Sequence, residues 1–400
     1  DMNITKGKRF FQFTQKENGD TYHIAGSLDE MKEGEFLVSG GDTDKEKYIL
    51  SGEILDDNGN PTGNNGSFFN ITGDKDINFT LKDLTVKDAV KNGNGSVISN
   101  TNQNAIIKVE NTIITGNKST GDGGAIYNGV SRTDGETNLT ISDTIFNDNV
   151  SGTGKGGAIY NAGNMTLQGT TFKTETDTIY LANSSNTLLK GENTVNSDIS
   201  GEENANISNN GIFNLNGDNS SYTGKFNQTG DEAANAQTNV TGTFFNGTTT
   251  IDNGALNWKT DKSASGILKI TGGQLNLISS DTVNSKLTLG ADSVIENAAK
   301  VYIDAKSELE LTDQSETNLN NNDTWLGKIT LDGGKLNLDN ITNYNNAKLE
   351  ANTGDLNINK GDLILASNSF INDTVNTTIA DGANLQINNT ANVSLKDNSS

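Results

Sequence analysis

The chain has 400 residues, with 51 Asp and Glu against 29 Lys and Arg, and its formal net charge is -22. This acidic balance argues against binding to nucleic acid or to anionic membrane surfaces, because both attract basic patches. The sequence contains no cysteine, which excludes disulfides, zinc–thiolate sites and thiol nucleophiles. It contains 44 Gly but one Pro, as expected for many tight turns between strands whose N–H groups are committed to ladders.

Residues 1–45 differ in composition from the rest of the chain. They hold the aromatic residues Phe10, Phe11 and Phe13, the single histidine His23, and the charge-dense stretch 29–33. We expect an N-terminal cap here, because the end of a stacked β-structure exposes strand edges that must be covered. A short helix is expected around residues 28–32. No apolar run approaches the length of a membrane span, and if the protein is secreted we expect its signal peptide to have been removed.

A repeated strand–turn–strand unit follows the expected cap. Its first and third positions are apolar, its fifth is Gly, Asp or Asn, and its eighth is usually large and apolar, which predicts alternation between two strand faces. The segments that share this frame are Tyr48–Leu55, Phe79–Val86, Ile107–Ile114, Leu139–Phe146 and Met165–Phe172.

A second phrase, Gly-Gly-Ala-Ile-Tyr-Asn, occurs at 123–128 and again at 156–161. Paired glycines permit a sharp corner and a close approach between backbones. We expect Ile126 and Ile159 to point inward and Tyr127 and Tyr160 to stack outward on successive coils. Asn128 and Asn161 are expected to form a hydrogen-bonded ladder between coils. Tyr180 follows a remnant of the phrase, so the basic coil is about 20 residues, with loops inserted near 129–137 and 150–155.

The apolar rhythm continues beyond residue 185 in pairs such as Leu275/Leu277, Leu309/Leu311 and Leu363/Leu365. The sequence therefore predicts an all-β fold, a parallel β-solenoid over residues 46–400 after a cap at 1–45. Residues 48–185 would form the coils with recognisable motifs, and residues 186–400 degenerate coils. The segment 231–236 is expected to protrude as a loop, and the chain is expected to be cut from something longer because its last residues still follow the rhythm.

The two Gly-Gly-Ala-Ile segments, together with the Phe-x-x-Asn at 146–149, resemble the paired repeat of the chlamydial polymorphic outer-membrane proteins and related autotransporter passengers. The resemblance covers roughly residues 48–180, with weaker Phe-x-x-Asn copies at 55–58 and 114–117. It implies a right-handed parallel β-helix of the pectin-lyase type, exported by type V secretion and displayed on the bacterial outer membrane as an adhesin. The translocator barrel of such a protein would lie outside this fragment. Chlamydial members often contain cysteine, and this chain has none.

In that family the two motifs are themselves associated with adhesion, which implies a list of candidate residues here. They are Gly123, Gly124, Ala125, Ile126, Phe146, Asn149, Gly156, Gly157, Ala158 and Ile159. The implied partners are a host-cell receptor or a surface glycan, and self-association. Tyr127, Arg132 and Tyr160 are candidate surface contacts, because tyrosines on successive coils would form an aromatic ladder. Ordinary decoration of the strand surface is the alternative interpretation of these residues.

An enzyme is the main rival, because polysaccharide lyases and hydrolases use the same fold. The chain lacks the Gly-His-Gly and Arg-Ile-Lys segments of such hydrolases. Its second arginine, Arg132, stands near Asp134 and Glu136 in an expected loop, which we interpret as solvated. His23 has no evident partner, and the stretch 56–60 imitates a calcium loop without its required Gly and Glu. We therefore expect no catalytic residue, metal or cofactor; a phage tailspike-like glycan binder and a passive stalk remain as further alternatives.

Overall fold

A computed structural model describes residues 9–12, 21–23, 34–40, 43–55, 61–65, 67–173, 177–230, 236–262, 266–312, 314–339, 341–387 and 390–394. All regular elements in these ranges are β-strands, nearly all of them paired in parallel, so the prediction of an all-β parallel solenoid is confirmed there. The described residues contain no helix with the length and apolarity needed to cross a membrane. The helix expected at 28–32 and the stretch 56–60 lie outside the described residues, as does most of 231–236.

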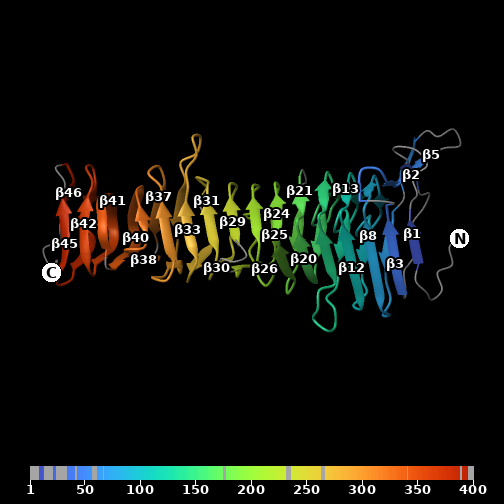
Figure 1. Ribbon diagram of the computed structural model, residues 1–400, viewed down its shortest axis with the longest axis horizontal. Coiled ribbons are helices and arrows are strands. Elements are labelled where there is room, and N and C mark those ends of the chain that lie inside the picture. Colours follow the sequence, from blue (N-terminus) through green and yellow to red (C-terminus); the bar gives the residue numbers. More distant parts are fainter. Residues whose placement is uncertain are drawn as a thin grey trace. The chain divides into compact units, whose positions relative to one another are not determined.

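The chain forms two compact units, which are described separately: Asp1–Ser208 with Asn216–Gly224, and Asn209–Leu215 with Lys225–Ser400. In the first unit, successive turns of the solenoid, here called coils, stack so that equivalent strands lie side by side (Figure 1). The first face consists of β1 (Arg9–Gln12), β3 (Gly34–Ser39), β8 (Ile77–Lys82), β12 (Ala105–Glu110), β16 (Leu139–Ser142), β20 (Asn164–Gln168) and β23 (Asn186–Lys190).

The other two faces of the first unit are built in the same way. The second consists of β2 (Thr21–His23), β4 (Ile49–Ser51), β9 (Thr85–Lys87), β13 (Ile113–Thr115), β17 (Ile145–Asn147), β21 (Thr171–Phe172) and β24 (Glu192–Val195). The third consists of β7 (Phe69–Ile71), β11 (Ile98–Asn100), β15 (Ile126–Asn128), β19 (Ile159–Asn161), β22 (Ile179–Leu181) and β25 (Ile199–Gly201). β5 (Glu53–Leu55) and β6 (Pro61–Asn65) form an antiparallel pair.

The alternation in the sequence explains the first face. In β8, Ile77, Phe79 and Leu81 are fully buried while the residues between them are not, as expected when successive side chains point to opposite faces. The turn that follows needs a left-handed residue at the fifth position of the repeat, and Asp83 and Asn111 supply φ values of 57° and 46° there. Gly, Asn and Asp adopt this conformation most readily. The prediction of a turn at this position is thus confirmed.

The segment Tyr48–Leu55 was predicted to begin a repeat unit, but it occupies a different position in the coil from the other four segments. Leu50 pairs with Val86, at the eighth position of the repeat, and Phe36 in β3 pairs with Phe79, at the first. The error arose because Tyr48-x-Leu50 has the same period-two pattern as the start of a unit, and that pattern alone does not fix which strand is which. Parallel strands thus occur within residues 1–45 at β1, β2 and β3; the expected cap falls mostly outside the described residues and stays a prediction.

The second unit is also a stack of parallel strands. One face contains β28 (Lys225–Gln228), β30 (Thr248–Ile251), β32 (Ile267–Ile270), β35 (Val294–Ile295), β38 (Glu316–Asn320) and β44 (Val375–Ile379). A second contains β27 (Ile212–Leu215), β29 (Gln237–Val240), β31 (Ala255–Trp258), β33 (Gln274–Leu277), β36 (Lys300–Ile303) and β39 (Thr324–Trp325). β26 (Asn206–Asn209) contains residues assigned to both units.

Later coils of the second unit have three paired sides. β34 (Lys286–Leu289), β37 (Glu308–Thr312), β43 (Phe370–Ile371) and β46 (Asn392–Val393) belong to the third side. β40 (Lys328–Asp339) turns a corner, because it pairs with β37 before the corner and with β38 after it. β41 (Ile341–Ile358) turns corners in the same way and pairs with β42 (Gly361–Leu365), which in turn pairs with β45 (Ala383–Ile387).

A ladder of charges lies across the third side of the second unit. Lys328 is bound to Glu308 and to Glu350, on the preceding and following coils, with Nζ–O distances of 3.1 Å to each. Lys286 extends the ladder with an Nζ–O distance of 3.0 Å to Glu310. Opposite charges on neighbouring strands are within reach of one another across a sheet, and together they form a network rather than isolated pairs.

Candidate binding surface on the first unit

The Gly-Gly-Ala-Ile segments form the corner that leads into β15 and β19. Gly123 and Gly156 have φ values of 64° and 74°. A Cβ on Gly124 would stand 1.9 Å from the carbonyl oxygen of Gly157 on the next coil. In the first pair, Gly123 therefore permits the left-handed turn and Gly124 permits the close approach of the next coil.

The Phe-x-x-Asn segment builds the opposite part of the same coil. Phe146 stacks on Phe172 of the next coil, with ring centroids 4.8 Å apart. Asn149 donates from Nδ2 to the carbonyl of Ile114 (2.9 Å) and accepts from Nδ2 of Asn117 (2.9 Å). Ile114 pairs with Phe146, so the weaker copy at 114–117 occupies the equivalent position, as its spacing indicates.

All ten motif residues are buried, with Ala125, Phe146, Ala158 and Ile159 at 0% exposure. The expectation that Ile126 and Ile159 point inward is confirmed. The side chains of these residues contact the interior and neighbouring coils rather than solvent. These buried residues therefore act on the surface indirectly, by holding the neighbouring exposed residues in position.

The asparagines that end the phrase form the expected ladder inside the third face. Asn100 donates from Nδ2 to Oδ1 of Asn128 (2.9 Å), and Asn128 donates in turn to Asn161 (2.7 Å). Asn138 joins from the next strand of the coil and donates to Asn128 (2.9 Å). All four side chains are fully buried. Buried amides require such partners, and the ladder fixes the alignment of successive coils.

The tyrosines of the phrase form a stacked column on the outer side of the third face. Tyr127, Tyr160 and Tyr180 are paired in register. The ring centroids of Tyr127 and Tyr160 are 5.1 Å apart and those of Tyr160 and Tyr180 are 5.4 Å apart, with interplanar angles of 23° and 18°. The predicted stacking is confirmed, and Tyr127 and Tyr160 are partly exposed. Tyr180, expected to point outward with them, is buried at 6% exposure, and its hydroxyl is bound to Glu202.

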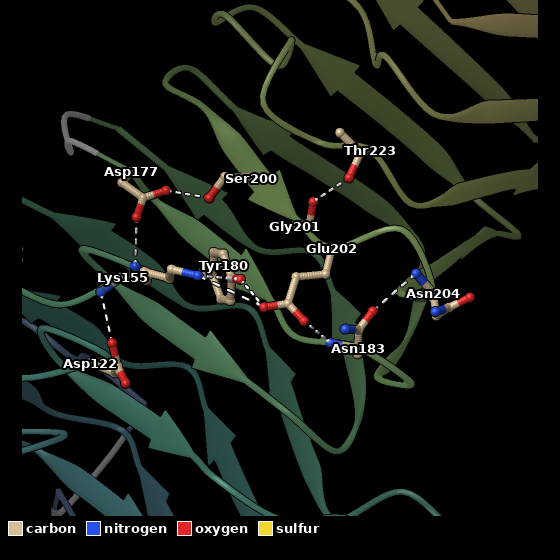
Figure 2. A network of polar contacts seen from close by, with 11 residues as sticks. Asp122, Lys155, Asp177, Tyr180, Asn183, Ser200, Gly201, Glu202, Asn204 and Thr223 are labelled. Atoms are coloured by element: carbon tan, nitrogen blue, oxygen red, sulfur yellow. Dashed lines mark hydrogen bonds and ion pairs between the residues drawn. The ribbon is translucent and has the colours of Figure 1, made fainter.

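A polar network closes one end of this column (Figure 2). Lys155 donates from Nζ to the hydroxyl of Tyr180 (2.5 Å), and its ammonium also lies 4.1 Å from the centre of that ring. Tyr180 donates its hydroxyl proton to Glu202 on the following coil. Glu202 accepts a further hydrogen bond from the backbone N–H of Asn183 (3.0 Å) and lies 3.8 Å from Lys155.

Two aspartates accept hydrogen bonds from the backbone beside this network (Figure 2). The backbone N–H of Lys155 donates to Asp122 (2.9 Å), and that of Gly156 donates to Asp177 (2.9 Å). Ser200 donates its hydroxyl proton to Asp177. Glu202, Asp177 and Ser200 were not singled out in the sequence. The sequence feature that could have identified them is the remnant of the phrase at 177–180, in which Asp177 stands at the corner that glycines occupy in the two complete phrases.

Burial and neighbouring charges shift the acid–base behaviour of the column. Burial, helped by the neighbouring phenols and carboxylates, raises the pKa of Tyr160 to about 12. Burial and the hydrogen bond to Glu202 raise the pKa of Tyr180. The hydrogen bond from Tyr180 is in turn the main cause that lowers the pKa of Glu202. At neutral pH the column is therefore a row of phenol groups that ends in a Lys–Glu pair.

Arg132 lies apart from the column, in the loop 129–137 that leaves the stack between β15 and β16 (Figure 1). Its guanidinium is bound to the Asp134 carboxylate through Nε (2.9 Å) and through a second nitrogen. The hydrogen bond from Arg132 lowers the pKa of Asp134 to about 2. Asp134 and Glu136 are exposed, which agrees with the interpretation of a solvated loop.

The second inserted segment, expected as a loop at 150–155, begins with a strand. β18 (Val150–Ser151) pairs in parallel with β14 (Lys118–Ser119), which pairs with β10 (Val90–Lys91). Two preceding coils thus contribute to the same small sheet. Residues 152–155 lie outside any strand, as expected of an inserted loop, whereas the pairing of Val150 and Ser151 was not predicted, because these two-residue strands lack the apolar alternation that marks a strand.

In the described part of the chain, no three or more His, Asp or Glu side chains are arranged to hold a metal ion. His23 belongs to β2. The chain matches no known protein-family profile, and no curated protein matches it.

Proposed function

We propose that this chain is part of a secreted bacterial surface adhesin, an autotransporter-type passenger whose β-solenoid makes contacts to a host-cell receptor, a surface glycan or a neighbouring cell. The observation that carries the proposal is the tyrosine column. Tyr127, Tyr160 and Tyr180 place phenol groups on consecutive coils, beside Lys155 and Glu202. Aromatic residues with a polar tip are frequent at protein interfaces.

The buried motifs support this surface from within. The glycine corner and the asparagine ladder hold successive coils in register, so the column has fixed spacing before any partner arrives. A preorganised surface loses less conformational entropy on binding. Many copies of such a protein on one cell would add weak contacts into a strong attachment.

A role without catalysis is part of the proposal. Arg132, the arginine nearest to acidic residues in the sequence, has its guanidinium bound to Asp134. Secretion and display on the outer membrane are proposed from the resemblance of the motifs alone. Surface labelling of intact cells that express the full-length gene would test this location.

Binding of the purified chain to cultured epithelial cells and to a glycan array tests the function. Two variants address the surface: Lys155→Ala and Tyr160→Ala, which removes the middle ring of the column. Lys269→Ala, an exposed lysine of β32 in the second unit, is the control. We expect binding by the wild type and the control, and loss in the two surface variants. Absence of binding by the wild type would favour a passive stalk, and equal binding by all variants would remove the column from the interface.

A further inference from the structure

A groove of ≈ 590 Å³ lies in the second unit, where the chain enters β29, β31, β33 and β36. The strand register places Gln237, Ala255, Gln274 and Lys300 side by side on four successive coils. All four residues line the groove. The groove therefore runs along the stack, from coil to coil, rather than along one strand.

Glycine corners form part of the lining. Gly254 has a φ of 72°, and a Cβ there would stand 2.2 Å from the carbonyl oxygen of Ala236. Gly273 has a φ of 64°, and its Cβ would stand 2.6 Å from the carbonyl oxygen of Gly254. A side chain at either position would be strained as well as crowded. Glycine at these positions therefore lets the backbones of successive coils approach one another closely along the groove.

Several polar groups of the lining have no partner in the part of the chain that the structure describes. Gln237 accepts a hydrogen bond from Asn257 through Oε1 (3.0 Å), and its side-chain N–H groups have no acceptor among the described residues. Gln274 donates a hydrogen bond to Asn276 (2.7 Å), and its Oε1 has no donor among the described residues. The side chain of Asn253 and the ammonium of Lys300 have no hydrogen bond or ion pair within the described residues. Together they offer donors and an acceptor to a ligand.

Among the described residues, none of the ten that line the groove is Asp or Glu, and Lys300 is the one charged side chain of this lining, although the chain has a net charge of -22. Nearby carboxylates are committed elsewhere: Asp252 accepts from Thr271 (2.5 Å), and Asp323 accepts from the backbone N–H of Val301 (2.7 Å). Glu296 is exposed in the turn before Lys300 and does not line the groove.

We propose that this groove binds a linear oligosaccharide that carries carboxylate groups, of the uronic-acid type. Neutral side-chain amides suit sugar hydroxyls, which both donate and accept hydrogen bonds, and Lys300 binds a carboxylate at one end. The coils repeat every ~4.8 Å, which is similar to the length of one sugar unit in an extended chain. The positions of Gln237, Ala255, Gln274 and Lys300 thus match successive sugar units. This inference is independent of the tyrosine column.

A sugar fits these observations better than an acidic peptide. A sugar presents hydroxyls, which donate and accept hydrogen bonds as side-chain amides do, whereas an ionised acidic side chain only accepts. Three of the polar side chains are neutral amides. An acidic peptide is therefore the competing ligand that the experiment must include.

Isothermal titration of the full chain tests the proposal with three probes of equal length: tetragalacturonate, the neutral sugar maltotetraose and the peptide tetraglutamate. Lys300→Glu reverses the one charge in the groove. Ala298→Trp fills the groove from an exposed position, so that the core is not disturbed. Lys269→Glu is the matched control, because it makes the same charge change at an exposed site that does not line the groove. Thermal unfolding establishes that each variant is folded.

We expect saturable binding of tetragalacturonate, with weaker binding of the other two probes. Affinity should fall about tenfold or more in Lys300→Glu, because a charge-assisted hydrogen bond is replaced by repulsion. It should fall as far in Ala298→Trp and stay unchanged in Lys269→Glu. The proposal is overturned by absence of saturable binding, by equal binding of maltotetraose or tetraglutamate, or by unchanged affinity in both groove variants. Cell binding through the tyrosine column is expected to survive these changes, so the two proposals fail separately.

Discussion

Asn128 donates a hydrogen bond from Nδ2 to Oδ1 of Asn161, the equivalent residue one coil further along the chain, over 2.7 Å. Asn128 also accepts from Asn100 and from Asn138, each over 2.9 Å. These groups are fully buried, so no water replaces a lost partner. The alignment of the third face thus depends on polar contacts inside the solenoid as well as on aliphatic packing.

We expect Asn128→Ala to destabilise the coils around β15 and β19 by roughly 2–4 kcal/mol, because several buried amide groups lose a partner. Hydrogen exchange of the backbone amides in these strands would measure the local loss. The exposed Asn92→Ala is the control, with little change expected. Equal protection in the wild type and Asn128→Ala would show that the ladder contributes nothing to stability.

Gly124→Ala is expected to lower stability by about 1–3 kcal/mol or more, because the added Cβ would collide with the backbone of the next coil. The closest atom is the carbonyl oxygen of Gly157, at 1.9 Å. At Gly290 a Cβ would meet nothing within 4 Å. Urea unfolding of both variants would compare them, and a similar midpoint shift for the two would contradict a steric origin.

The tyrosine column makes stability depend on alkaline pH. Because the pKa of Tyr160 is raised to about 12 in the folded chain, and an unfolded tyrosine titrates near 10, the folded state holds this proton more tightly. Its contribution to stability is complete below pH ~10 and is lost as the pH rises from there through ~12. Thermal unfolding between pH 9 and 12 would measure this loss.

Tyr160→Phe is the matched variant, because it keeps a stacked ring and removes the titrating group. We expect its melting temperature to fall less between pH ~10 and ~12 than that of the wild type. Absorbance at the tyrosinate band would report the titration directly. An identical dependence of the melting temperature on pH in both proteins would contradict this explanation.

The charge ladder of the second unit is expected to make its stability sensitive to salt. Burial opposes the charge of Lys328, but Glu350 and Glu308 outweigh it and raise the pKa of the lysine. Lys328→Gln leaves the two carboxylates without their shared cation and should cost about 1 kcal/mol at low salt. In 1 M salt, where the screening length is about 3 Å, the difference from the wild type should shrink. Lys269→Gln is the control, with no salt-dependent difference expected.

The sequence predicted those parts of the fold in which chemistry repeats from coil to coil. The spacing of Tyr127, Tyr160 and Tyr180 predicted their register correctly, since a tyrosine recurs at the same position of each coil. It also gave the equivalence of Asn117 with Asn149. The frame of Tyr48–Leu55 was wrong because an apolar pair with one residue between them fits any of the three faces.

The surface was harder to predict, because it is formed by residues whose proximity depends on the stacking. Glu202 lies close to Lys155 only because the three coils that contain β19, β22 and β25 stack on one another. The groove in the second unit is lined mostly by small and neutral residues, which carry no motif. The small sheet of β10, β14 and β18 lacks apolar alternation. In each case the local sequence carries no recognisable pattern, and the site is formed only when the coils stack.

The equivalence of Tyr160 and Tyr180 has a consequence for how such genes change. The same backbone position recurs after one full coil, and each time it pairs in register with the coil before it and the coil after it. Recombination that removes or duplicates the coding sequence of one coil joins two chain ends that have the same direction and the same position within the coil. Length can therefore vary between descendants by whole coils while each remaining layer keeps its contacts.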